Sequence, residues 1–139
     1  MNDRQKVLIL CTGNSARSQM AERLLRHIAG DCFEVASAGV APTSVRQEAI
    51  EALEEINVST EGLRSKSIDE FTAQKFDYLI TVCDNANQNC PIFPGKAERI
   101  HWSIDDPAAV SGDAEERLNA FRIARDQLLD KLLIFAERC

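Results

Sequence analysis

The sequence has no apolar run that approaches the ~20 residues needed to span a membrane. Its first ten residues, MNDRQKVLIL, are too short and too polar for a signal peptide. It also has no basic excess, because its formal net charge is -6. Nucleic acids and anionic membranes attract basic surfaces, so neither is expected as a partner. These absences predict a cytoplasmic protein.

Metal-binding patterns are missing as well. The two histidines and five cysteines include no C-x2-C pair, so no metal site is predicted. An odd number of cysteines without an export signal favours a reducing compartment, where they serve as packing residues or redox-active thiols. The 139 residues are enough for one hydrophobic core, and we expect a single domain over residues 1–139. The cysteines are Cys11, Cys32, Cys83, Cys90 and Cys139.

One stretch, residues 6–18 (KVLILCTGNSARS), organises the rest of the chain. Its apolar run 7–10 predicts a strand buried on both faces of a sheet. After it, apolar residues at every fourth position predict a helix; they are Met20, Leu24 and Ile28. The segment between them carries Cys11, a run of small residues, Arg17 and Ser18, and it forms a loop that leads into the start of the helix.

This loop is predicted to bind a tetrahedral oxyanion. Backbone N–H groups at a helix start have no partner within the helix, and the helix dipole favours an anion there. Arg17 adds a planar fork for two oxygens, and the same groups stabilise a thiolate at Cys11. Cys11 is therefore the expected nucleophile, although a buried cysteine beside a surface arginine is the alternative. The expected binding residues are Thr12, Gly13, Asn14, Ser15, Ala16, Arg17 and Ser18.

The remaining chain alternates between strand and helix patterns, which predicts an α/β fold with a parallel sheet. Residues 84–97 are rich in Asn, Pro and Gly and are expected to form a mobile loop. A short helix capped by Ser67 is also expected. Further strands are predicted at 33–38, 77–83 and 98–102, and helices at 44–57 and 114–137.

Two further cysteines fall close to the predicted loop. If the first and third strands are neighbours, Cys11 and Cys83 end strands ~4.8 Å apart, so Cys83 can attack a group bound to Cys11. Cys90 follows seven residues later, which is ~10 Å in a helix against a disulfide limit of ~7 Å. A bond between Cys83 and Cys90 therefore requires that segment to refold. The alternative is two unrelated cysteines, and Cys32 is interpreted as a packing cysteine.

An acid is expected in the loop after the fourth strand. Pro107 restricts Asp106 to extended geometry, which helps to aim its carboxyl group. A thiolate that displaces oxygen from a tetrahedral centre needs a proton for the departing oxygen, and Asp106 is the candidate. Its alternative role is that of an ordinary turn residue, and Asp105 is the less favoured acid.

The segment CTGNSARS resembles the phosphate-binding loop of the low-molecular-weight protein tyrosine phosphatase superfamily. CTGNS and TVCDNANQNCP also resemble its thioredoxin-coupled arsenate reductase branch, and the likeness covers nearly the whole chain. It implies a four-stranded sheet of order 2-1-3-4 with helices on both faces, and Asp106 as the acid. It further implies arsenate reduction, the chemistry of arsenic detoxification, by a Cys11, Cys83 and Cys90 relay that thioredoxin regenerates without a bound cofactor. Phosphate and sulfate would then bind as arsenate mimics.

The sequence departs from this pattern at two places, and one of them is Ala16, where some relatives have cysteine. Some reductases of this kind carry a potassium site near the loop, which Asn14, Glu22 and Ser37 fit in part. The acidic residue expected near position 66 is missing, because Lys66 stands there and could place an ammonium group where the cation would be. We therefore predict no potassium requirement. Two alternatives stay open. The first is a phosphatase, but the acid loop IDDPAAV lacks the tyrosines that typically follow the acid in that branch. The second is an oxyanion-binding or redox-sensing module without turnover.

Overall fold

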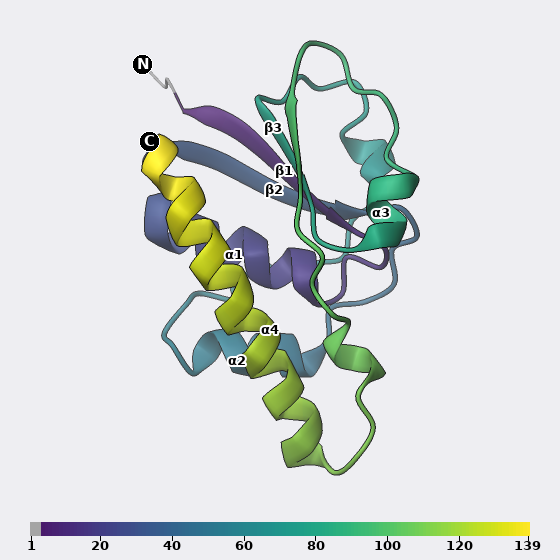
Figure 1. Cartoon of the computed structure of the whole chain (residues 1–139), viewed down its shortest axis with the longest axis vertical. Coiled ribbons are helices and arrows are strands. Elements are labelled where there is room, and N and C mark those ends of the chain that lie inside the picture. The colour runs from purple at the N-terminus through teal and green to yellow at the C-terminus, as the bar shows by residue number, and fades with distance from the viewer. Residues whose placement is uncertain (1–3) are drawn as a thin grey trace.

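The computed structural model describes residues 4–139 and has a parallel sheet at its centre (Figure 1). Within these residues, four strands lie in the order β2-β1-β3-β4, which confirms the predicted α/β class and the order that the resemblance implied. Every pairing is parallel, so the carboxyl ends of the strands share one edge. The strands are β1 (Gln5–Cys11), β2 (Phe33–Gly39), β3 (Tyr78–Thr81) and β4 (Glu98–His101).

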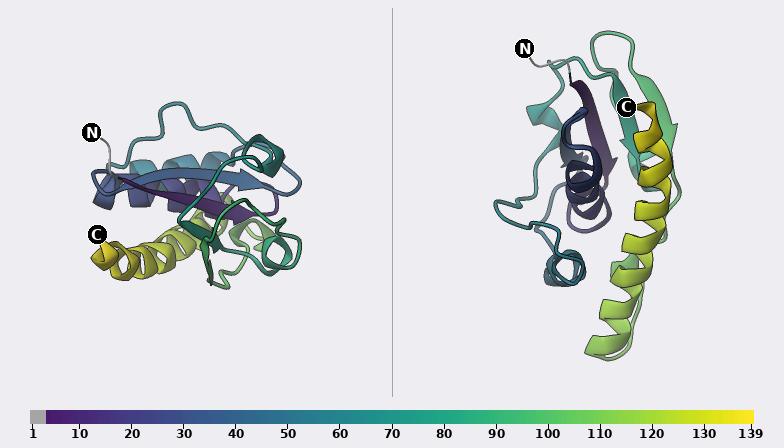
Figure 2. Two further views of the ribbon diagram at one scale, coloured as in Figure 1. Left: turned by 90° about the horizontal axis from the view of Figure 1, so that it is seen from above. Right: turned by 90° about the vertical axis from the view of Figure 1, so that its left-hand side faces the viewer.

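Helices cover the sheet on the side of α4, while the connection between α2 and β3 runs along the opposite side (Figure 2). α1 and α4 pack against each other, and α2 contacts both. No helix within residues 4–139 is long and apolar enough to cross a membrane. The helices are α1 (Arg17–Ala29), α2 (Gln47–Glu54), α3 (Asp84–Gln88) and α4 (Ala114–Phe135), with the short turns η1 (Ile68–Glu70), η2 (Pro107–Ala109) and η3 (Ala136–Arg138).

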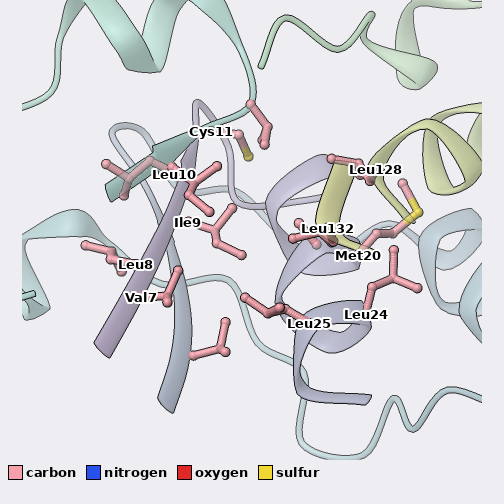
Figure 3. Close-up of a cluster of buried hydrophobic side chains, with 14 of the residues drawn as sticks. Val7, Leu8, Ile9, Leu10, Cys11, Met20, Leu24, Leu25, Leu128 and Leu132 are labelled. Carbon is pink, nitrogen blue, oxygen red and sulfur yellow. The ribbon is translucent and has the colours of Figure 1, made fainter. Parts of the chain in front are cut away.

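The core fixes the strand that carries Cys11. Residues 7–10 of β1 are completely buried, as the unbroken apolar run predicts. Val7 and Ile9 point toward leucines of α1 and α4, and Leu8 points to the other face of the sheet (Figure 3). The periodicity of the last helix predicts a buried stripe of Leu118, Phe121, Ala124, Leu128, Leu132 and Phe135; all are buried except Leu118, which is partly exposed. The end of β1 therefore sits on a rigid, close-packed base.

The expected boundaries of several elements need correction. α2 is shorter than the predicted 44–57, and the last helix ends at Phe135 rather than at residue 137. Residues 84–88, expected in a loop, form α3, because the Cys83 side chain caps its start by accepting from the Ala86 N–H. The expected cap at Ser67 is confirmed at the start of η1.

Candidate active site

The loop between β1 and α1 turns its carbonyl groups outward. The carbonyls of Thr12, Gly13 and Ser15 accept hydrogen bonds from the backbone N–H groups of Ala41, Thr43 and Arg46, at 2.9, 3.0 and 2.8 Å. In a trans peptide the N–H points away from the carbonyl of the same plane. The N–H groups that follow these carbonyls therefore point away from the 41–46 segment, toward the concave side of the loop. This is the arrangement of an anion site.

Gly39 lets the loop lie directly against the end of β2. A Cβ atom at this position would lie 2.6 Å from the Thr12 carbonyl oxygen and 2.8 Å from the Asn14 nitrogen. Both atoms belong to the backbone and cannot move aside cheaply, so only glycine fits here. The sequence analysis did not single out Gly39, although its place directly after an apolar strand was the available signal.

Cys11 ends β1, and its side chain is buried within hydrogen-bond distance of Ser18. Its Sγ lies 2.8 Å from Ser18 Oγ, and the Asn14 amide donates to that same Oγ at 2.7 Å. Since Asn14 occupies the oxygen as an acceptor, the Ser18 hydroxyl hydrogen is free to point at the sulfur. Ser18, expected as a binding residue, thus contacts the candidate nucleophile directly.

Asn14 shapes the loop from inside. Its backbone adopts a left-handed conformation with φ 46°, which asparagine tolerates better than most residues. Its side-chain oxygen accepts from the Gln19 amide and the Lys66 backbone N–H, both at 2.8 Å, and its amide donates to Ser37 Oγ at 3.0 Å. These hydrogen bonds hold the loop in shape. Gln19 was missed, although a polar residue beside an apolar helix stripe could have indicated it.

The buried carboxylate of Glu22 holds Ser37, which in turn contacts Asn14 of the loop. Glu22 is only 2% exposed and accepts from Ser37 Oγ at 2.8 Å, while Lys66 Nζ lies 3.5 Å from it. Burial lowers the pKa of Lys66, and the charge of Glu22 offsets part of that effect. Lys66 thus brings an ammonium group to the carboxylate, as the sequence suggested. The absence of a potassium requirement stays a prediction.

Arg17 and Asp106 approach each other at the same sheet edge. Arg17 opens α1 and donates to the Ile104 carbonyl at 2.8 Å, and its other terminal nitrogen lies 3.9 Å from Asp106 Oδ2. Asp106 caps η2 by accepting from the Ala108 N–H at 2.9 Å, which fixes its carboxyl group beside the Pro107 turn. The half-exposed carboxyl group is therefore oriented toward the arginine of the anion loop.

Cys83 lies against the residue that follows the candidate nucleophile. Its Sγ is 3.3 Å from Thr12 Oγ1, and Asn85 Nδ2 donates to the same oxygen at 3.0 Å. Cys83 is 5% exposed, and α3, which begins at the next residue, packs against β1. The structure therefore brings the second cysteine to the anion loop, as expected from neighbouring strands.

Cys90 lies beyond the other end of α3. Among the described cysteines, Cys11, Cys83 and Cys90 are free thiols. A helix over residues 83–90 would place the Cα atoms of Cys83 and Cys90 ~10 Å apart, more than a disulfide allows. Partial burial raises the pKa of the Cys90 thiol, so this thiol is held in its protonated form. The structure represents a state in which Cys90 is not joined to Cys83.

A side-chain clamp that the sequence analysis missed holds the start of α3. Asp84 Oδ1 lies 2.9 Å from His101 Nε2 and accepts from Ser103 Oγ at 3.2 Å. The other ring nitrogen of His101 lies 2.7 Å from Thr81 Oγ1. The hydrogen bond from His101 lowers the pKa of the Asp84 carboxyl group. The clamp ties the helix that separates Cys83 from Cys90 to β4.

The remaining two cysteines are joined to each other. Cys32 and Cys139 form a disulfide with their Cα atoms 5.7 Å apart. The prediction that Cys32 is a packing cysteine is therefore wrong. The sequence placed these residues 107 positions apart, and only the docking of α4 beside β2 brings them together.

The site brings together a cysteine, a helix N-terminus, an arginine and a carboxyl group, which are the groups that an α/β enzyme acting on tetrahedral oxyanions would need. Comparison with known families is consistent with that class. The family described as low molecular weight phosphotyrosine protein phosphatase matches residues 6–138, and the chain belongs to this family.

Curated relatives cover the chain almost completely. An arsenate reductase from Halalkalibacterium halodurans is 39% identical over 135 residues, which cover 97% of each chain. An arsenate reductase from Bacillus subtilis is 37% identical over 131 residues, which cover 94% of each chain. The likeness to proteins of this name therefore extends over the whole fold.

Solved structures of more than one activity share the fold. An arsenate reductase in its oxidised state has a TM-score of 0.81 at 28% identity and covers 96% of this chain and 98% of its own. The tyrosine phosphatase Wzb from Escherichia coli K30, in complex with sulphate, has a TM-score of 0.78 at 25% identity, with 97% and 98% covered. A thioredoxin-dependent arsenate reductase from Corynebacterium glutamicum has a TM-score of 0.62 at 27% identity, with 94% and 63% covered. Reductase and phosphatase therefore have to be separated by the site rather than by the fold.

Proposed function

We propose that this protein is an arsenate reductase that uses Cys11, Cys83 and Cys90 in sequence and is regenerated by thioredoxin. The observation that carries the proposal is the position of Cys83, whose thiol contacts Thr12, the neighbour of Cys11. A phosphatase needs the nucleophile, the arginine and the acid, but it has no use for a second thiol there. The relatives named arsenate reductase, one of them thioredoxin-dependent, support the same activity.

In the first step arsenate occupies the anion loop in the way that phosphate would. The inward N–H groups and Arg17 bind its oxygens, and the Cys11 thiolate, hydrogen-bonded by Ser18, attacks arsenic. Asp106 gives a proton to the departing oxygen, which leaves as water. A bond between Cys11 sulfur and arsenic replaces one arsenic–oxygen bond, and arsenic is still pentavalent.

In the second step Cys83 attacks the Cys11 sulfur as a thiolate. The sulfur–arsenic bond breaks and its electron pair stays on arsenic, which becomes trivalent and leaves as arsenite. Cys11 and Cys83 are oxidised to a disulfide, so two thiols have supplied the two electrons. The hydroxyl of Thr12, 3.3 Å from Cys83 Sγ, can donate a hydrogen bond to the attacking sulfur.

In the third step Cys90 attacks Cys83 and releases Cys11 as a thiolate. The resulting Cys83–Cys90 disulfide requires the segment that contains α3 to refold, because a helical path from residue 83 to residue 90 would span ~10 Å, beyond the ~7 Å reach of a disulfide. The dithiol of thioredoxin then reduces this bond and restores both thiols. Because thioredoxin has to reach the protein, we place the activity in a reducing compartment such as the cytoplasm.

The test measures arsenate-dependent NADPH oxidation with thioredoxin and thioredoxin reductase, in parallel with phosphoester hydrolysis. Cys11→Ser should abolish both reactions, because a serine hydroxyl is a poor nucleophile at neutral pH. Cys83→Ser should still form the arsenate adduct but release no arsenite, and Cys90→Ser should stop at the Cys11–Cys83 bond. If peptide mapping finds Cys83 and Cys90 as free thiols after arsenate turnover without thioredoxin, the relay is wrong.

Phosphoester hydrolysis is the second candidate, and the anion loop with its arginine and acid favours it. It requires Cys11, Arg17 and Asp106 alone. Hydrolysis that is unchanged in Cys83→Ser and Cys90→Ser, together with no arsenate turnover in the wild type, would make it the better assignment.

A further inference from the structure

The disulfide between Cys32 and Cys139 lies at the opposite end of the sheet from the candidate active site. Cys32 directly precedes β2, whose first residue pairs with Gln5, while Cys11 pairs with Gly39 at the far end. Seven residues of strand at ~3.3 Å each separate the two ends by ~20 Å. Figure 1 shows the end of α4 at the amino edge of the sheet and α3 at the other edge. No direct exchange between this pair and Cys11 can occur over such a distance.

We propose that Cys32 and Cys139 form a reversible redox modification site that is independent of the catalytic thiols and of the proposed function. Its oxidant is a low-molecular-weight disulfide of the glutathione type. One protein thiolate attacks that disulfide and releases one small thiol, which gives a mixed disulfide. The second protein thiolate then attacks the protein sulfur and releases the other small thiol. Two protein thiols are thereby oxidised, and one external disulfide is reduced to two thiols.

The native fold prepares the pair for this exchange. The Cys32 backbone is held on both sides, because its carbonyl accepts from the Gln5 N–H and its N–H donates to the Ala29 carbonyl, both at 3.0 Å. The end of α4 is anchored separately, since the Phe135 ring packs 5.1 Å from that of Phe33. With both segments held by other contacts, the Cα atoms rest at 5.7 Å, within the ordinary range for a disulfide.

A small thiol or disulfide can reach the pair. Cys139 is exposed and Cys32 is partly exposed. Both line a surface hollow of about 380 Å³, together with Arg26, His27, Gly30 and Asp31.

The bond would act on stability rather than on turnover. It closes a loop of 107 residues, which includes every described strand and helix except β1 and α1, and a cross-link over so long a loop strongly restricts the unfolded chain. We expect oxidation to raise the melting temperature by about 10 °C. Since the catalytic edge lies ~20 Å away, arsenate turnover should be unchanged at temperatures where both forms are folded.

The test uses a variant with serine at 11, 83 and 90, so that Cys32 and Cys139 are the remaining thiols. The reduced variant is incubated with glutathione disulfide, and its free thiols, cross-linked peptides and melting temperature are measured. We expect two thiols to disappear, an intramolecular Cys32–Cys139 peptide to form, and the melting temperature to rise and fall again with dithiothreitol. The matched control adds Cys139→Ser, which should keep glutathione on Cys32 and show no rise.

A second measurement keeps the proposal testable if that variant folds poorly. In the wild-type protein the same cross-link should form under glutathione disulfide, and Cys32→Ser with Cys139→Ser should keep the wild-type arsenate turnover while losing the added thermal stability. Stable glutathione adducts on both cysteines, a cross-link between two chains, or two thiols that stay free would each overturn the proposal.

Discussion

The Thr12 hydroxyl lies 3.3 Å from the Cys83 sulfur, so the residue next to the candidate nucleophile also contacts the second thiol. Asn85 donates to the Thr12 oxygen at 3.0 Å, which leaves the hydroxyl hydrogen free to point at the sulfur. The Thr12 side chain therefore lies between the candidate nucleophile and the second thiol. Loss of its hydroxyl should slow the attack of Cys83 on Cys11 and leave the attack of Cys11 on arsenic unchanged.

Thr12→Val removes this hydroxyl and keeps the branched shape. Hydrogen bonds to charged groups contribute ~1.5–3 kcal/mol, so arsenite release in a single turnover should slow about tenfold to a hundredfold. Phosphate affinity should change little, because the backbone supplies the anion contacts. Thr12→Ser is the matched control and should stay near the wild-type rate; equal rates in Thr12→Val and the wild type would refute the role of the hydroxyl.

Asp106→Asn removes the proton that the departing oxygen needs. General acids contribute about 10²–10⁴-fold, so formation of the Cys11–arsenate adduct should slow by a factor in that range while phosphate affinity is kept. Adduct formation can be followed by rapid quench and mass spectrometry. Asp105→Asn is the control from the neighbouring position, and a large loss there with none at Asp106 would reverse the assignment.

The attack of Cys90 on Cys83, the third step of the proposed mechanism, should become faster as the pH rises. Burial raises the pKa of Cys90 above that of an ordinary cysteine, so at neutral pH most of this thiol is protonated. Exchange requires the thiolate, whose fraction grows about tenfold for each pH unit below the pKa. Conversion of Cys11–Cys83 to Cys83–Cys90 should therefore be faster at pH 9 than at pH 7 in a quenched single turnover. A rate that falls over this interval would contradict the expectation.

Releasing the clamp on α3 should speed the same conversion. His101→Ala removes the hydrogen bond to Asp84, so α3 should unwind more easily. Hydrogen exchange at residues 84–90 should increase and Cys83–Cys90 formation should accelerate several-fold, while exchange at residues 7–10 stays slow. Lys96→Ala, in the connection between α3 and β4, serves as the control. Unchanged exchange in His101→Ala would show that the clamp does not limit the opening.

The parts of the fold that depend on local pattern could be read from the sequence. The buried run 7–10, the anion loop and the last helix follow from periodicity and from the unpaired N–H groups at a helix start. The strand order came from the resemblance, because spacing alone does not say that β3 lies beside β1. The short α3 was missed because its asparagine-rich composition opposes a helix, and a single sulfur cap decides the outcome.

Contacts between distant segments account for the other omissions. Gly39 matters only because the loop of β1 folds back on the end of β2. The clamp needs residues from the end of β3, from α3 and from β4 to meet. The Cys32–Cys139 pair needs the docked C-terminal helix. None of these contacts leaves a signal in the periodicity or spacing of the sequence, because each depends on how distant elements are placed in space and not on whether a segment forms a helix or a strand.

The hydrogen bond from Arg17 to the Ile104 carbonyl has a consequence for substrate choice. In the proposed mechanism the Arg17 guanidinium binds the oxyanion and also holds the Ile104 carbonyl, two residues before Asp106. The same planar group therefore positions both the anion and its proton donor. A lysine has no second arm with which to keep that carbonyl while it neutralises the anion. In the proposed mechanism, selectivity for tetrahedral oxyanions therefore depends on how these two loops are aligned, and a change in one of them would displace the other.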